Sequence, residues 1–167
     1  ERIQGIVDRT NRLNADIIVM LGDYVAGHRQ VTRYIPASEW APVLAGLKAP
    51  LGVHAVLGNH DWWEDKVIQR EGQGHTVARR ELEAAGIPVY ENKAIRLTKD
   101  GHPFWIAGLG DQWAFWPKPE DYKEFVKHGK KDYAGVDDLD GTLRQVSDDA
   151  PVILMAHEPD IFPEVPK

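Results

Sequence analysis

An apolar run that ends in a polar tetrad decides the fold of this chain: VHAVLGNHD, residues 53–61. The run from Val53 to Leu57 is short and continuous and ends at Gly58, which predicts a buried strand. The tetrad of residues 58–61 therefore stands at the carboxyl end of the predicted strand.

The same pattern occurs twice more along the chain. The apolar run 17–21 is followed by Gly22-Asp23, and the run 151–156 is followed by His157. Both runs predict strands buried on both faces. In open α/β sheets, ligands bind outside the carboxyl ends of the strands. If the three strands are parallel neighbours, the following residues converge at one sheet edge: Asp23, Asn59, His60, Asp61 and His157.

Helical segments alternate with these strands, which indicates an α/β layered fold. We expect helices over 1–14, from Pro36 with Ser38 as N-cap, over about 76–85 and over 138–148. Short β-rich pieces occupy 88–90, 94–97 and 103–107, and 110–135 is expected to be a long loop with a helical turn. No repeat or linker interrupts the pattern, so we interpret residues 1–167 as a single domain.

The composition excludes several classes of protein. The chain has 167 residues, with 20 Lys+Arg against 26 Asp+Glu and a net charge of −6. Nucleic-acid affinity depends on cationic side chains, so we expect no nucleic-acid partner. The absence of cysteine excludes a disulfide framework, a thiolate zinc site and a cysteine nucleophile.

Both ends of the chain look cut, because it begins without Met inside an amphipathic segment and stops soon after a predicted strand. No apolar run approaches the ~20 residues of a membrane helix. We expect the chain as given to be soluble and to lack a membrane span. The compartment of the parent protein, cytoplasmic or membrane-associated, stays open, as does the oligomeric state.

The polar residues at the three strand ends form a mixed ligand set of carboxylate, amide oxygen and imidazole, which suits Mn, Fe or Zn. Each cluster also has a structural explanation. Gly22-Asp23 is a common turn, Asn59 or Asp61 can cap a segment that begins at Trp62, and His157 can be a half-buried histidine. Their joint occurrence behind three apolar runs favours a functional site.

Three motifs resemble the calcineurin-like metallophosphoesterases: LGD at 21–23, LGNHD at 57–61 and MAHEPD at 155–160. The Pro-Asp step after the late histidine is similar to the branch that contains membrane-associated bacterial phosphoesterases. This resemblance implies a four-layer α/β/β/α sandwich, with two divalent metal ions at the strand ends.

The resemblance also implies roles for the site residues. Asp23 would bridge the two metals, and Asn59 and His157 would bind the second one. His60 would lie beside the phosphate and assist the departing alkoxide, with Asp61 holding its imidazole in place. The implied reaction is hydrolysis of a phosphomonoester, phosphodiester or pyrophosphate bond by a water that two metals activate. The substrate would be a phosphorylated small molecule or a lipid-linked phosphoester.

Two motifs of the family's pattern are missing from the chain. No Asp-x-His precedes Gly22, and no Gly-His-x-His follows His157. We therefore interpret the chain as a fragment of the domain that binds at most one metal tightly and has weak or no activity. The family's first strand normally lies inside the sheet, so its absence is expected to lower stability. The alternative is a catalytically inactive binding module with the same fold.

Four further residues are candidates for substrate binding. His28 and Arg29 follow Asp23 closely and can contact a phosphate, although charged loop residues are usually solvated. Trp113 and Trp116 can form an apolar wall for a lipid-linked or aromatic leaving group, but loop packing is the more common role of tryptophan. The segment GLGD at 108–111 resembles only weakly a nucleotide loop, because a third glycine is missing.

Overall fold

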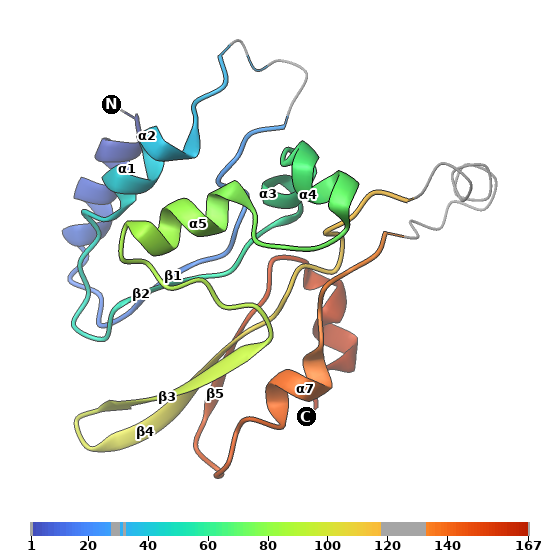
Figure 1. Cartoon of the computed structure of the whole chain (residues 1–167). Coiled ribbons are helices and arrows are strands. Elements are labelled where there is room, and N and C mark those ends of the chain that lie inside the picture. Colours follow the sequence, from blue (N-terminus) through green and yellow to red (C-terminus); the bar gives the residue numbers. More distant parts are fainter. Residues whose placement is uncertain (1, 28–30, 32, 118–132, 167) are drawn as a thin grey trace.

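The structure is a computed structural model that describes residues 2–27, 31, 33–117 and 133–166 (Figure 1). Helices and strands alternate along the chain, which confirms the mixed α/β class, while the four-layer order stays a prediction. The elements are α1 (Arg2–Asn11), β1 (Ile18–Met20), α2 (Ala37–Leu44), β2 (Val53–Ala55), α3 (Asn59–Trp63), α4 (Lys66–Glu71), α5 (Val77–Ala84), β3 (Lys93–Lys99), β4 (His102–Gly108), α7 (Leu139–Leu143), β5 (Val152–Met155) and the 3-10 helix η1 (Pro159–Glu164).

The strands form two separate sheets. β1 pairs in parallel with β2, with Ile18 opposite Val53. The second sheet has the order β3-β4-β5, in which β3 and β4 form an antiparallel hairpin and β5 runs parallel to β4. The expectation that the three site-bearing strands are neighbours in one sheet is therefore wrong for β5. The pairing of β5 with β4 joins residues far apart in the sequence, so no local sequence pattern predicts it.

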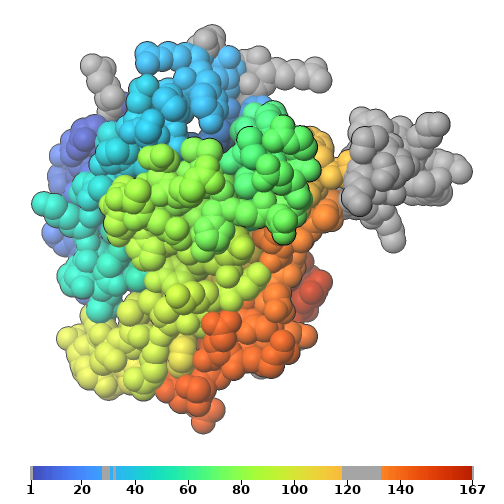
Figure 2. Space-filling model, viewed as in Figure 1, coloured from blue at the N-terminus to red at the C-terminus, as the bar shows by residue number. Residues whose placement is uncertain are grey.

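The hydrophobic core divides into clusters around these sheets. One cluster joins residues of both sheets: Val56, Tyr90, Ile106 and Met155. Two more lie between β1, β2 and the helices α1, α2 and α5. A fourth joins the ends of β4 and β5 to α7 and η1. Figure 2 shows α4 and α5, in green, over one face, with the segment after residue 132, in orange, below them.

Two helix boundaries differ from the sequence prediction. α2 begins at Ala37 after Pro36, so Ser38 lies in its first turn and is not its N-cap. α7 ends at Leu143 instead of continuing to 148. Asp148 accepts hydrogen bonds from Trp105 Nε1 at 2.8 Å and from Ala150 N at 3.2 Å, which turns the chain toward β5.

The prediction that β1 and β5 are buried on both faces is only partly correct, because each strand has an exposed apolar side chain. Val19 on β1 is 39% exposed and Ile153 on β5 is 44% exposed. Both strands stand at the edge of their sheets within the described residues, so one flank of each has no neighbouring strand. None of the described helices is long and apolar enough to cross a bilayer.

Candidate metal centre

The loops that follow β1 and β2 touch each other at two glycines. Gly22 has φ +99°, and a Cβ on it would lie 2.2 Å from Gly58 N. Asp23 also adopts a left-handed conformation, with φ +58°, which Asp tolerates better than most side chains do. The close approach of the two loops brings Asp23 next to the tetrad of residues 58–61.

Asp61 holds the two loops together. Its Oδ1 accepts hydrogen bonds from Tyr24 N at 2.9 Å and Val25 N at 3.1 Å. Its Oδ2 accepts from Asp23 N at 3.0 Å and Gly58 N at 2.9 Å. Four amides fill the acceptor positions of one carboxylate.

The four hydrogen bonds of Asp61 described above all come from backbone amides. The expected contact of Asp61 with the His60 imidazole stays a prediction. Burial raises the pKa of Asp61 to about 7, with the Gly58 amide opposing the rise and the charge of Asp23 adding to it. We therefore assign Asp61 to the support of the backbone around Asp23.

Asp23 and His157 meet although they come from different sheets. Asp23 Oδ1 accepts a hydrogen bond from His60 N at 3.1 Å and lies 3.5 Å from His157 Nε2. His157 Nδ1 lies 2.6 Å from Leu21 O, which accepts only, so Nδ1 carries the hydrogen. Because Nδ1 is bonded to Leu21 O, Nε2 is the ring nitrogen of His157 that faces Asp23.

The surroundings of His157 act on its pKa in both directions. Burial lowers the pKa, but the hydrogen bond to Leu21 and the charges of Asp23, Asp111 and Glu158 outweigh it, so the pKa is raised. A metal ion that binds an imidazole nitrogen competes with a proton for that nitrogen.

Gly58 leaves the space at the centre of this cluster. A Cβ on Gly58 would lie 2.6 Å from Asp23 Oδ1 and 2.7 Å from His157 Cε1. Asn59 follows as the first residue of α3 and is buried. The structure thus brings the segment with Asn59 together with Asp23 and His157, as the sequence analysis expected.

An aromatic cluster adjoins this centre through His60. The His60 ring packs edge-on against Trp63, with centroids 5.2 Å apart. The ring centroids of Trp63 and Trp116 lie 4.4 Å apart, and Trp63 Nε1 donates a hydrogen bond to Trp113 O at 2.7 Å. The Tyr133 ring stacks on both Trp63 and Trp113. Trp116 is 48% exposed. The candidates His28 and Arg29 lie outside the described residues.

Two buried carboxylates near His157 were not among the predicted site residues. Asp111 is 2% exposed and Glu158 is 9% exposed. Burial raises the pKa of Asp111 to about 7, against the opposing effects of the Trp113 amide and His157. Asp111 follows the apolar strand β4 as His157 follows β5, and that shared position was the signal that could have identified it.

The carboxylate oxygens and the imidazole nitrogen gathered here fit a divalent cation such as Mn, Fe or Zn. The amide oxygen of Asn59 as a further ligand stays a prediction. A concavity of about 690 Å³ lies elsewhere, at the amino ends of β1 and β2, beside Asn11 and Gly52. Its described lining residues include no carboxylate or histidine, so it offers no comparable chemistry.

Comparison with known proteins gives one family. A family model described as calcineurin-like phosphoesterase matches residues 1–160. The chain is 31% identical over 158 residues to the metallophosphoesterase F40B5.2 of Caenorhabditis elegans, covering 95% of this chain and 27% of that protein. It is 29% identical to the Bacillus subtilis metallophosphoesterase YkuE, and the match covers 96% of this chain and 46% of that protein. A Danio rerio transmembrane protein with a metallophosphoesterase domain is also 29% identical, and that match covers 95% of this chain and 31% of that protein. No solved structure matches significantly.

Proposed function

Because the chain belongs to the calcineurin-like phosphoesterase family, we propose that the full-length protein hydrolyses phosphoesters with a cation held by Asp23, Asn59 and His157. The observation that carries the proposal is the 3.5 Å separation of Asp23 Oδ1 and His157 Nε2. Asp23 follows β1 of one sheet and His157 follows β5 of the other, and Gly58 keeps the space between their side chains open.

The protein groups prepare the centre in distinct ways. Leu21 O fixes the tautomer of His157, and the His60 amide orients the Asp23 carboxylate. A carboxylate offers two oxygens, so Asp23 can bind two cations in a longer protein that supplies further ligands. A divalent cation there would polarise a phosphoryl oxygen and activate water for attack on phosphorus. His60 is proposed to protonate the departing alkoxide.

The aromatic cluster supports an apolar leaving group. Trp63 contacts His60 on one side and the half-exposed Trp116 on the other. A lipid-linked or aromatic group bound on Trp116 and Trp113 would therefore leave from the position of His60. The alternative, that these tryptophans only pack the loop, predicts equal effects of their substitution on all substrates. The bond cleaved is proposed to be a phosphomonoester, a phosphodiester or a pyrophosphate.

The chain spans 27%, 46% and 31% of the lengths of the three relatives named above. The activity, substrates and partners of a whole protein are therefore proposals. For these 167 residues alone we propose one tightly bound cation and weak or no turnover, because only Asp23 is assigned to a second metal.

A phosphoester panel tests the proposed function. The full-length protein would be loaded separately with Mn²⁺, Fe²⁺ and Zn²⁺ and assayed on an aryl phosphate, an aryl phosphodiester and pyrophosphate. Asp23→Asn should abolish turnover with each ion, while Asp149→Asn, an exposed residue before β5, should leave it unchanged. Turnover that survives Asp23→Asn would overturn the proposal, and a full-length protein inactive on every substrate would favour the binding module.

A further inference from the structure

The carboxyl end of β4 carries a carboxylate with no part in the centre proposed above. β4 and β5 run parallel, with Gly108 opposite Met155, so the residues that follow them lie side by side. Leu109 N donates to Met155 O at 2.9 Å, which keeps the two segments together beyond the strands. Asp111 is thereby placed beside the residues that follow β5.

One oxygen of Asp111 is buried without a partner. Oδ1 accepts a hydrogen bond from Trp113 N at 2.7 Å. Oδ2 is inaccessible to solvent and has no hydrogen-bond partner among the described residues. No Lys or Arg in the described part of the chain forms an ion pair with Asp111. A buried carboxylate oxygen without a partner is costly unless a proton or a cation compensates it.

The distances around Asp111 suit such a cation. One oxygen of Asp111, one of Glu158 and one nitrogen of His157 all lie within 4.8 Å of one another. Ligand atoms about 2.1 Å from a shared ion lie about 3 to 4.3 Å apart. Shifts of a few tenths of an ångström would therefore place all three on one ion. His157 Nε2 is the nitrogen available, because Nδ1 is bonded to Leu21 O.

We propose that Asp111 and Glu158 are ligands, together with His157, of a divalent cation at the carboxyl ends of β4 and β5. Asp23 lies 3.5 Å from the same His157 nitrogen, and we assign this ion to the proposed centre, so the inference rests on that proposal. If Asp23 and Asn59 bind the same ion, it has five protein ligands. An oxygen-rich set of this size favours six-coordinate Mn²⁺ over four-coordinate Zn²⁺.

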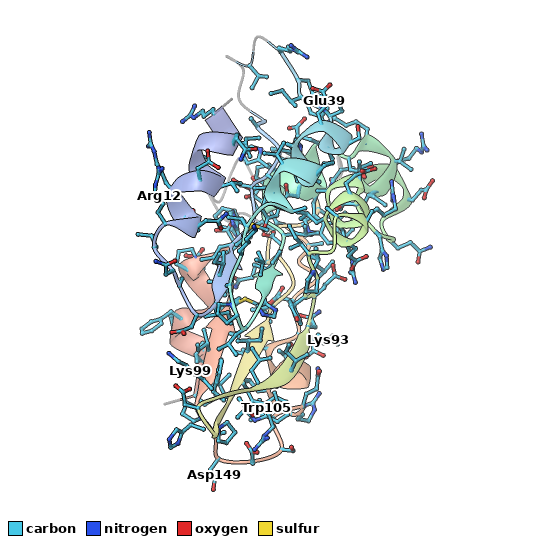
Figure 3. The ribbon with its side chains drawn as sticks, turned by 90° about the vertical axis from the view of Figure 1, so that its left-hand side faces the viewer. Arg12, Glu39, Lys93, Lys99, Trp105 and Asp149 are labelled. Carbon is cyan, nitrogen blue, oxygen red and sulfur yellow. The ribbon has the colours of Figure 1, made fainter. Side chains whose placement is uncertain are left out.

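Manganese binding to the 167-residue chain tests this inference. Free Mn²⁺ would be followed by electron paramagnetic resonance during titration of the wild type, Asp111→Asn and Glu158→Gln. Asn at 111 keeps an acceptor for Trp113 N and removes only the anionic oxygen. The matched control is Asp149→Asn, since Asp149 is exposed (labelled in Figure 3) and precedes β5, whereas His157 follows it.

We expect Asp111→Asn and Glu158→Gln each to raise the Kd for Mn²⁺ at least tenfold and Asp149→Asn to leave it unchanged. Wild-type Kd values in both variants would overturn the inference. If Asp111→Asn proves unfolded by circular dichroism, the result for Glu158→Gln decides.

Asp23→Asn separates the two possible failures. If it weakens Mn²⁺ binding while Asp111→Asn and Glu158→Gln do not, the proposed centre stands and this inference falls. If the wild type binds no Mn²⁺, or Asp23→Asn binds it as well as the wild type, the proposed centre falls too.

Discussion

At the scale of single residues, the candidate centre depends on two positions with no ligand role of their own. Gly58 supplies space between Asp23 and His157, and Asp61 supplies acceptors for the amides around Asp23. Both lie in the tetrad that makes the sequence recognisable. Two of the four residues of the tetrad, Gly58 and Asp61, therefore shape the site and need not bind the metal themselves.

A methyl group at position 58 should disrupt the centre without straining the backbone. Gly58 has φ −109° and ψ 169°, which alanine adopts readily, so the effect of Gly58→Ala comes from its contacts. Because Asp23 N would lie only 2.7 Å from the new Cβ, the loops must separate. We expect at least a tenfold loss of Mn²⁺ affinity by titration calorimetry.

The matched control for that substitution is Gly5→Ala. Gly5 lies inside α1, and a Cβ there meets no atom within 4 Å. Alanine should stabilise the helix by about 0.5–1 kcal/mol and leave metal affinity unchanged. An unaltered Mn²⁺ affinity in Gly58→Ala would show that the space at position 58 is irrelevant to metal binding.

The support role of Asp61 predicts a loss of stability even without metal. Asparagine has one acceptor oxygen, so Asp61→Asn leaves amides of the Asp23–Val25 loop or of Gly58 without a partner. Each buried amide left unpaired costs about 1–3 kcal/mol. We expect urea unfolding in EDTA at pH 8 to show a loss of about 2 kcal/mol or more. A stability equal to that of Asp149→Asn would contradict the assigned role.

At the scale of elements, side chains outside the helices decide where α7 ends and β5 begins. Asp148 binds Trp105 on β4 and pairs with Arg96 on β3 at 2.9 Å. Periodicity predicts a helix up to 148, because a hydrogen bond to a residue 43 positions away leaves no trace in the local pattern. Thr76, in contrast, caps α5 through Arg79 N, a local contact that sequence reasoning anticipates well.

The contacts of Asp148 predict a specific dependence on pH. The hydrogen bond from Trp105, then the Ala150 amide and Arg96, hold the pKa of Asp148 below its usual value. The stability that this carboxylate contributes is therefore fully present above its unfolded pKa of about 3.9 and is lost as the pH falls from that value through its lower folded pKa.

Thermal unfolding of Asp148→Asn measures this dependence. The wild type should exceed the variant in Tm by more at pH 6 than at pH 3, where the carboxyl group is largely protonated in the unfolded chain. Figure 3 shows Trp105 and Asp149 in the lower part of the molecule and Glu39 near the top. Asp149→Asn, next to Asp148, serves as the local control. An equal difference in Tm at both pH values would refute the prediction.

At the scale of the whole molecule, two sheets meet at the candidate centre. The rule that polar residues follow buried strands identifies Asp23, Asn59 and His157 from sequence, because each stands directly behind an apolar run. The rule cannot say which sheet holds β5, since its pairing with β4 joins residues far apart in sequence, such as Trp105 and Val152. It applies equally to Asp111 behind β4, where the glycines of the segment suggested a nucleotide loop instead.

The exposed flanks of β1 and β5 bear on the expected instability of the chain. The family resemblance implies a further strand inside the sheet, and Val19 and Ile153 are apolar side chains left open at the edges of β1 and β5. Exposed apolar strand edges promote association between chains. Metal-binding measurements are therefore best made at low protein concentration.

The metal content of the dialysed chain tests the convergence of Asp23 and His157 most directly. After incubation with Mn²⁺ and dialysis against metal-free buffer, elemental analysis would be applied to the wild type, Asp23→Asn and His157→Ala. We predict about one equivalent of Mn²⁺ in the wild type and little or none in either variant. Equal metal content in all three proteins would contradict it.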